Sequence, residues 1–221
     1  MFNKILVKKI IETNINKINF QPLGDKALKS IKGMKTILIK KGFENIIKNN
    51  LPEEVNIKVI SVLEDKIFKK VDAYYVSQNL ELLEEIFHCV QLWGGVTGRN
   101  IYVRGKGFAD NFNLISYEKL ANKINVISNL RDAVKALQEF KSANKHINVS
   151  FITKHSRFMS ARNEIFGQLP IYDSILSKNI MNKNPTFKDL HHYWEEMINL
   201  SKEYNISLKE LERIIFNYFR D

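Results

Sequence analysis

Cysteine is nearly absent from this chain. The 221 residues include one cysteine, Cys89, so an intrachain disulfide and a four-cysteine iron-sulfur cluster are both excluded. No apolar run approaches the roughly 20 residues of a membrane-spanning helix, and the N-terminal sequence MFNKILVKKIIETNINK lacks a signal-peptide cleavage pattern. The sequence therefore predicts a soluble, cytoplasmic protein with no membrane partner.

Acidic residues are in deficit. There are 24 of them against 34 lysines and arginines, which gives a formal net charge of +10. The excess is concentrated in residues 1–50, which hold eleven lysines and three acids. Such a balance favours a polyanionic partner, above all nucleic acid. A general lysine enrichment, with the charges lying on solvated helix surfaces, remains the alternative.

Apolar residues are plentiful and recur mainly at helical spacing. They make up 44% of the chain and include 24 aromatic residues, enough for a sizeable core in one or two closely packed domains. The spacing predicts a mainly all-α fold. Helices are expected over residues 3–13, 79–92, 116–127, 130–142, 153–163, 174–180, 187–204 and 207–220. A further helix is expected over 25–49, interrupted near its glycines, and another is expected to begin at 51–54. Residues 71–76 read either as a strand or as a turn between helices.

A glycine-rich stretch follows the predicted helix 79–92. Residues 93–99 read WGGVTGR, and residues 104–107 read RGKG. Glycines allow a backbone to approach a ligand closely, while Arg99 and Arg104 supply positive charge. The lysine-serine or lysine-threonine pair of a Walker motif is missing. A ligand-binding turn and a plain loop with glycine caps are both compatible with this pattern.

The stretch from residue 147 to residue 178 combines an amine with a carboxylate. Lys154 stands near the start of a predicted helix, and Asp173 follows 19 residues later, where a proline-bounded loop turns into the next helix. The proline favours an extended approach, so Asp173 is expected to cap that helix and to stay ionised near its positive end. A surface lysine and a plain helix cap remain the alternative.

The adjacent histidines His191 and His192 do not predict a metal site. Neighbouring positions on a helix point in different directions and lack the i, i+4 spacing of a helical zinc site. The aromatic residues that follow, Tyr193 and Trp194, either stack on a nucleobase or belong to the core.

Residues 147–178 resemble the helix-hairpin-helix DNA glycosylases, most closely the bacterial 8-oxoguanine DNA glycosylase-like proteins. In that superfamily a catalytic lysine follows the hairpin, and a catalytic aspartate lies about twenty residues later at a helix start. Lys154 in Thr-Lys-His and Asp173 in Pro-Ile-Tyr-Asp-Ser match these positions. The resemblance covers the C-terminal half, with a weaker similarity over residues 93–107.

This resemblance implies a two-lobed helical fold, with residues 1–115 forming a mostly helical N-terminal lobe and residues 116–221 the catalytic helix-hairpin-helix lobe. Within the latter, residues 130–142 are expected to form the first arm, 143–152 the hairpin and 153–163 the second arm. The superfamily's hairpin is rich in glycine because its backbone N–H groups approach a phosphate. Here the expected positions 149–152 hold Val, Ser, Phe and Ile.

The function implied by the resemblance is a DNA glycosylase with AP lyase activity that acts as a monomer on double-stranded DNA and needs no cofactor or metal. The expected substrate carries a damaged base, 8-oxoguanine in the first place, flipped into a pocket. Lys154 and Asp173 are the expected catalytic residues. DNA contacts are expected from His155, Arg157, Arg99, Arg104 and Ser150, and the base pocket from Trp93, Tyr193 and Trp194. A non-catalytic DNA-binding helical protein is the alternative.

Overall fold

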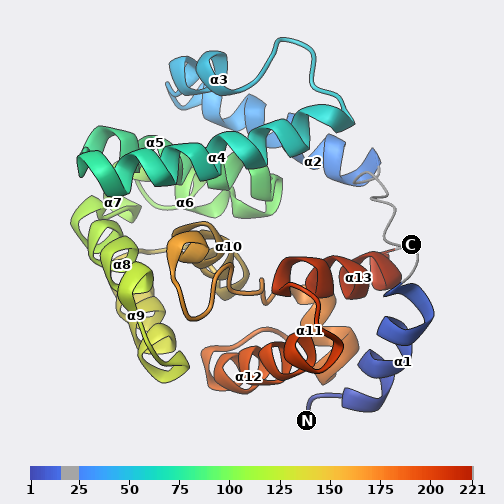
Figure 1. Ribbon diagram of the computed structural model, residues 1–221. Coiled ribbons are helices and arrows are strands. Elements are labelled where there is room, and N and C mark those ends of the chain that lie inside the picture. Colours follow the sequence, from blue (N-terminus) through green and yellow to red (C-terminus); the bar gives the residue numbers. More distant parts are fainter. Residues whose placement is uncertain (16–24, 221) are drawn as a thin grey trace.

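The computed structural model describes residues 1–15 and 25–220, and within these ranges the secondary structure is entirely helical (Figure 1). The all-α prediction is confirmed. Residues 16–24, which belong to the basic N-terminal segment, lie outside the described residues. In the part of the chain that is described, no helix has the length and apolarity required to cross a membrane.

Asparagine side chains begin many of these helices. Asn56, Asn79, Asn113, Asn129 and Asn148 each accept a hydrogen bond from a backbone N–H in the first turn of the helix that follows. An asparagine at this position satisfies one of the N–H groups that the helix itself leaves unpaired. The starts of these helices are therefore determined by the local sequence.

Four helices form one group, in the upper part of Figure 1: α2 (Asp25–Lys40), α3 (Glu44–Asn50), α4 (Ile57–Ser77) and α5 (Leu80–Gly94). The left-handed Gln78, with φ 54°, reverses the chain so that α4 and α5 pack against each other. The structure corrects two expectations here: residues 71–76 belong to α4, and no helix starts at 51–54.

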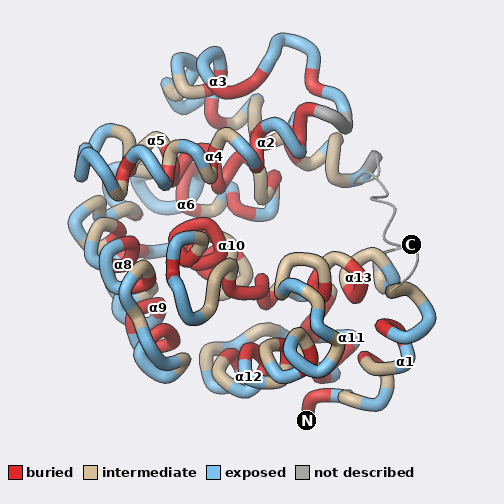
Figure 2. Tube along the Cα trace, in the orientation of Figure 1, coloured by how far each residue is buried: buried red, intermediate tan, exposed pale blue. Residues whose placement is uncertain are grey.

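A central element joins this group to the rest of the molecule. After the short helices α6 (Asn100–Val103) and α7 (Phe108–Asn111), the chain forms α8 (Leu114–Val126), α9 (Leu130–Ala143) and α10 (Val149–Met159). Helix α10 lies in the middle of Figure 1 and packs against α4, α5, α8 and α9. Figure 2 shows it as one of the most deeply buried parts of the chain.

The remaining group consists of α11 (Ser174–Met181), α12 (Phe187–Tyr204), α13 (Leu208–Arg220) and the N-terminal helix α1 (Lys4–Asn14). Helix α1 packs against α11 and α13 (Figure 1), and the Asn3 N–H donates to the Ile180 carbonyl at 2.9 Å. The first helix of the chain therefore belongs with the last three, which differs from the expected division into residues 1–115 and 116–221.

Candidate active site

Lys154 lies in the second turn of α10 and is half-buried. Its Nζ is 4.4 Å from the centroid of the Phe151 ring. Its aliphatic stem lies against the end of α5, because a Cβ added at Gly94 would stand 3.2 Å from Lys154 Cδ. The side chain is thus held between two helices and does not extend freely into solvent.

Asp173 is the N-cap of α11, as the sequence predicts. One of its oxygens, Oδ1, accepts hydrogen bonds from the N–H groups of Ile175 at 2.9 Å and Leu176 at 3.0 Å. Its backbone is extended, with φ −99° and ψ 178°. Because Oδ1 accepts both capping bonds, Oδ2 takes no part in them, and the negative charge lies at the positive end of the helix.

The structure brings the segments of Lys154 and Asp173 together. The Thr153 hydroxyl, on the residue before the lysine, accepts a hydrogen bond from the N–H of Tyr172, on the residue before the aspartate, at 3.1 Å. Among the ion pairs formed by the described residues, none joins Lys154 to Asp173 within 4.0 Å. The amine and the carboxylate are therefore neighbours that do not neutralise each other by direct contact.

The surroundings of Lys154 shift its amine toward the neutral form. Burial lowers the pKa of its amine below the ordinary lysine value, and the negative charges of Asp173 and Glu212 oppose this shift without cancelling it. A lysine with a lowered pKa carries a larger fraction of free amine near neutral pH, which is the form that acts as a nucleophile.

The glycine-rich turn has a structural explanation. A Cβ at Gly94 would lie 2.5 Å from Phe151 Cε1, and one at Gly98 would lie 2.4 Å from the same atom. Both glycines therefore let the turn pack directly on the Phe151 ring beside Lys154. Gly95 has φ 80°, and its position lets the Ser30 hydroxyl accept a hydrogen bond from the Val96 N–H at 3.0 Å.

His155 does not reach DNA, contrary to the expectation. Its side chain has no exposed surface, and it stacks on Phe87 with ring centroids 4.7 Å apart. Its two ring nitrogens hydrogen bond to Gln91 at 3.0 Å and to Tyr117 at 2.8 Å. Burial lowers its pKa to about 3, so the ring is a neutral part of the core.

Arg157 is also buried, at 3% exposure, and cannot bind a phosphate from this position. Its guanidinium pairs with Glu212 at 2.6 Å and with Glu64 at 3.4 Å. The expectation of a DNA contact fails because the guanidinium is buried and its Nη1 and Nη2 groups donate to these two carboxylates, from α13 and α4. The arginine instead joins three helices.

Tyr193 and Trp194 have no exposed surface and do not line a base pocket. The Tyr193 hydroxyl donates to the Ile171 carbonyl at 2.9 Å, and Trp194 Nε1 donates to the Pro170 carbonyl at 2.7 Å. Both aromatic residues are core residues that also hold the extended segment before Asp173. The core alternative left open by the sequence is the one observed.

Trp93, the third residue expected in the base pocket, is less buried than Tyr193 and Trp194. It is half-buried at the end of α5, with its ring edge-on to Phe158 at a centroid distance of 5.2 Å. Within the described residues its indole N–H has no hydrogen-bond partner, although buried donors are normally paired. A role for Trp93 in base binding stays a prediction.

The hairpin between α9 and α10 consists of residues 144–148, so the expected hairpin residues 149–152 belong to α10. His146 adopts a left-handed conformation, with φ 62°, at a place where glycine is usual. Ser150, expected to contact DNA, is half-buried in the first turn of α10, and its carbonyl accepts the Thr153 hydroxyl at 3.0 Å.

The hairpin lies against the loop of residues 104–107. The Lys145 N–H donates to the Asn111 carbonyl at 3.0 Å, and a Cβ at Gly105 would stand 3.9 Å from His146 Nε2. Arg104 and Lys145 are both exposed, so this junction presents positive charge on the surface. Arg99 is exposed as well, after the glycine-rich turn.

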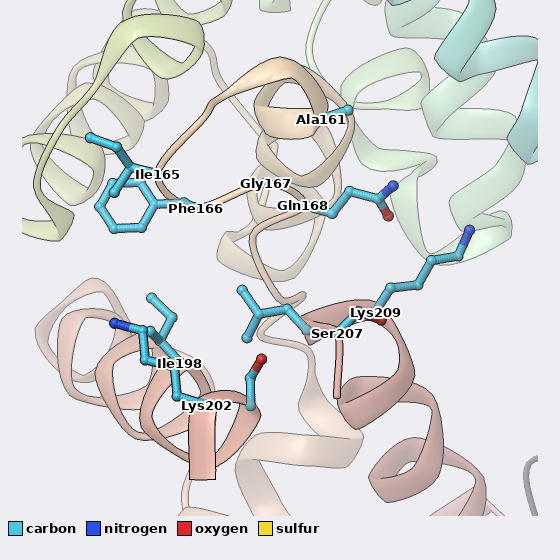
Figure 3. A pocket seen from close by; sticks show the side chains of 11 residues that line it. Ala161, Ile165, Phe166, Gly167, Gln168, Ile198, Lys202, Ser207 and Lys209 are labelled. Carbon is cyan, nitrogen blue, oxygen red and sulfur yellow. The ribbon is translucent and has the colours of Figure 1, made fainter. Parts of the chain in front are cut away.

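A separate hollow of about 470 Å³ opens between the loop after α10 and the ends of α12 and α13 (Figure 3). Phe166, Ile198 and Leu208 supply apolar walls, with Lys202 and Lys209 on the rim. Neither Lys154 nor Asp173 lines it. The hollow is therefore distinct from the candidate active site.

Three buried polar residues near the site were not identified from the sequence: Thr153 and Glu212, which contact the segment before Asp173, and Glu64, which pairs with Arg157 without contacting that segment. The two glutamates are buried at 6% exposure each, yet in sequence they resemble ordinary charged positions on amphipathic helices. A hydroxyl directly before the candidate lysine was the only local signal.

Comparison with known proteins gives no assignment. No protein-family model, no curated protein and no solved structure matches this chain. The candidate site therefore rests on its own geometry.

Proposed function

We propose that this protein is a DNA glycosylase with associated AP lyase activity, in which Lys154 is the nucleophile and Asp173 the assisting carboxylate. The observation that carries the proposal is the convergence of a half-buried amine of lowered pKa and a helix-capping carboxylate. The residues that precede them are joined by a hydrogen bond from the Tyr172 backbone N–H to the Thr153 side-chain hydroxyl.

The chemistry follows from the two groups. The lone pair of the neutral amine attacks C1′ of the nucleotide, the bond from C1′ to the base breaks, and the base leaves with the bonding electrons. The resulting hemiaminal ether carries both Nζ and the ring oxygen on C1′, and cleavage of the C1′–O4′ bond, with O4′ taking a proton to become a hydroxyl, gives an imine between C1′ and Nζ. The imine acidifies the C2′ protons, so loss of one of them and departure of the 3′ phosphate nick the strand.

Asp173 has a defined part in this scheme. Its Oδ1 is held by two backbone N–H groups, so its charge is fixed in place before the reaction begins. A preorganised negative charge stabilises the positive charge that develops on the sugar as the base departs. The same carboxylate is suited to accept a proton from the attacking amine.

The DNA-binding part of the proposal rests on the exposed basic residues. Arg99, Arg104 and Lys145 stand on loops at the surface, and the net charge of +10 favours a polyanion. Phosphate contacts of this kind position a duplex without reading its sequence. By the resemblance of residues 147–178, the base removed is 8-oxoguanine.

Borohydride trapping tests the proposal. A duplex with 8-oxoguanine opposite cytosine, and one with an abasic site, are incubated with the protein and reducing agent, and covalent adducts are separated by denaturing electrophoresis. Native protein is expected to form an adduct, and Lys154→Ala to form none. Asp173→Asn, which keeps the cap, is expected to lower the trapping rate by about a hundredfold or more.

Lys178→Ala is the matched control, because Lys178 lies on α11, the helix that Asp173 caps, and is exposed. It is expected to trap as the native protein does. If native protein forms no adduct with either duplex yet binds both, the non-catalytic DNA-binding function replaces the proposal. An adduct that survives in Lys154→Ala would assign the chemistry to another amine.

A further inference from the structure

The segment before Asp173 is held in an unusual way. Residues 170–172 belong to no helix, so their backbone groups gain no partners from regular secondary structure. They are nevertheless buried, and buried backbone groups need partners. Side chains from three different helices provide them.

Two of these side chains come from α12. Trp194 donates to the Pro170 carbonyl, and Tyr193 donates to the Ile171 carbonyl. They fix the segment against the C-terminal helices but make no link to the helix that carries Lys154.

The other two side chains make that link. Thr153 lies next to Lys154, and its hydroxyl accepts the Tyr172 N–H at 3.1 Å while donating to the Ser150 carbonyl at 3.0 Å. Glu212 of α13 accepts the Ile171 N–H through Oε2 at 2.6 Å. Its other oxygen, Oε1, accepts from Arg157 at 2.6 Å, one turn after Lys154.

Glu212 therefore spans two elements with one carboxylate. Each oxygen has its own donor, one on the backbone before Asp173 and one on α10. Glu64 pairs with the same Arg157, at 3.4 Å, and it also pairs with Lys209 and Arg213, which lie on α13. The two buried glutamates thus share the arginine and differ in their contact with the backbone before Asp173.

We infer that Glu212 and Thr153 are positioning residues that set Asp173 relative to Lys154, by tying the extended segment before the aspartate to the lysine-bearing helix. This inference rests on the proposed function. Neither residue touches the reacting atoms, since both are buried behind the site at 6% and 0% exposure. Their contribution lies in geometry, where a displacement of about 1 Å costs on the order of a hundredfold in rate. The Glu212 charge also raises the pKa of Lys154, so loss of that charge alone favours the free amine and does not explain a fall in rate.

Paired substitutions separate this role from general stability. Glu212→Gln leaves a single acceptor oxygen for two donors, so one of its two links is lost. Glu64→Gln removes the same charge from beside Arg157 and leaves the Ile171 bond intact. Likewise Thr153→Val removes the hydroxyl with little change of shape, whereas Thr153→Ser retains it.

The assay is the single-turnover rate of borohydride-trapped adduct at saturating DNA, measured beside the dissociation constant for the same duplex. Glu212→Gln and Thr153→Val are expected to lower the rate by about tenfold to a hundredfold. Their affinity for DNA is expected to stay within about twofold of native, because the side chains are buried. Glu64→Gln and Thr153→Ser are expected to react within about threefold of native.

The outcomes are distinct. Native protein that forms no adduct would overturn the proposed function and this inference with it. Native protein that reacts, with Glu212→Gln and Thr153→Val reacting equally well, would overturn the positioning role alone. If Glu212→Gln and Glu64→Gln lower the rate equally, the positioning role of Glu212 is also overturned, because the effect then comes from the shared ion pair with Arg157. Far-ultraviolet circular dichroism establishes which variants fold, and if one of the pair does not, the other decides.

Discussion

Replacing Gly94 by alanine is expected to destabilise the protein and to displace Lys154. The added methyl would stand 2.5 Å from Phe151 Cε1, 2.9 Å from Cζ of the same ring and 3.2 Å from Lys154 Cδ. The ring is 1% exposed, and it cannot retreat along the turn because Gly98 already packs on the same edge. The Phe151 ring, the Lys154 side chain or the end of α5 must therefore move.

The size of the effect follows from two opposing contributions. An extra carbon in a packed core costs about 1–3 kcal/mol, and this site belongs at the upper end because the ring is confined. Alanine in place of glycine in a helix returns up to about 1 kcal/mol. The net loss is about 2 kcal/mol, which lowers the melting temperature of a chain of this length by about 4–8 °C.

Thermal unfolding followed by circular dichroism measures the change, with Gly33→Ala as the control. Gly33 lies within α2, where an added Cβ would meet only Val96, at an ordinary 3.6 Å. That variant is expected to gain about 0.5–1 kcal/mol from helix propensity. A Gly94→Ala protein as stable as the native one would refute the packing of the glycine turn on α10.

The remaining predictions concern the charged groups of the site. Asp173→Ala is expected to lose about 1 kcal/mol of stability with the cap, whereas Asp173→Asn keeps it; denaturant unfolding of the two variants distinguishes capping from catalysis. Arg157→Met is expected to cost about 3–5 kcal/mol, because it leaves Glu212 and Glu64 buried without this partner; a smaller loss in urea titration would mean that the cluster relaxes around water. The pKa of His155 is lowered to about 3 by burial, so the unfolded chain binds the extra proton first and stability falls as pH drops below about 6.5, by up to about 1.4 kcal/mol per pH unit. Its ring resonances are expected to stay unchanged between about pH 5 and 8 in NMR spectra, and a titration in that range would contradict its burial.

Much of the helical architecture could be read from the chain. The predicted helices at 79–92, 116–127, 130–142 and 187–204 match the observed ones closely. Their signals are local, since an asparagine cap and apolar residues at helical spacing act within a few turns. The hairpin was predicted at residues 143–152, and only its end was placed too late, because Asn148 and not a later residue caps α10.

The burial of polar side chains could not be predicted from local sequence signals. His155 and Arg157 flank the candidate lysine on a helix rich in polar residues, and nothing nearby indicates that both are buried. Their partners are distant in sequence: Gln91 lies 64 residues from His155, and Glu212 lies 55 residues from Arg157. Only the packing of α5 against α10 and the ion pair from Glu212 of α13 to Arg157 reveal them.

The sequence by itself determined that the protein is helical, that Cys89 forms no internal disulfide and that Asp173 caps a helix. Each of these depends on composition or on interactions within a few residues. Tertiary structure alone decided that α1 joins the C-terminal helices and that Lys154 lies beside the contact of Gly94 with Phe151. It also decided that Glu212 reaches both α10 and the segment before Asp173. These features depend on which helix faces meet, and that choice is made by burial of the whole apolar surface at once.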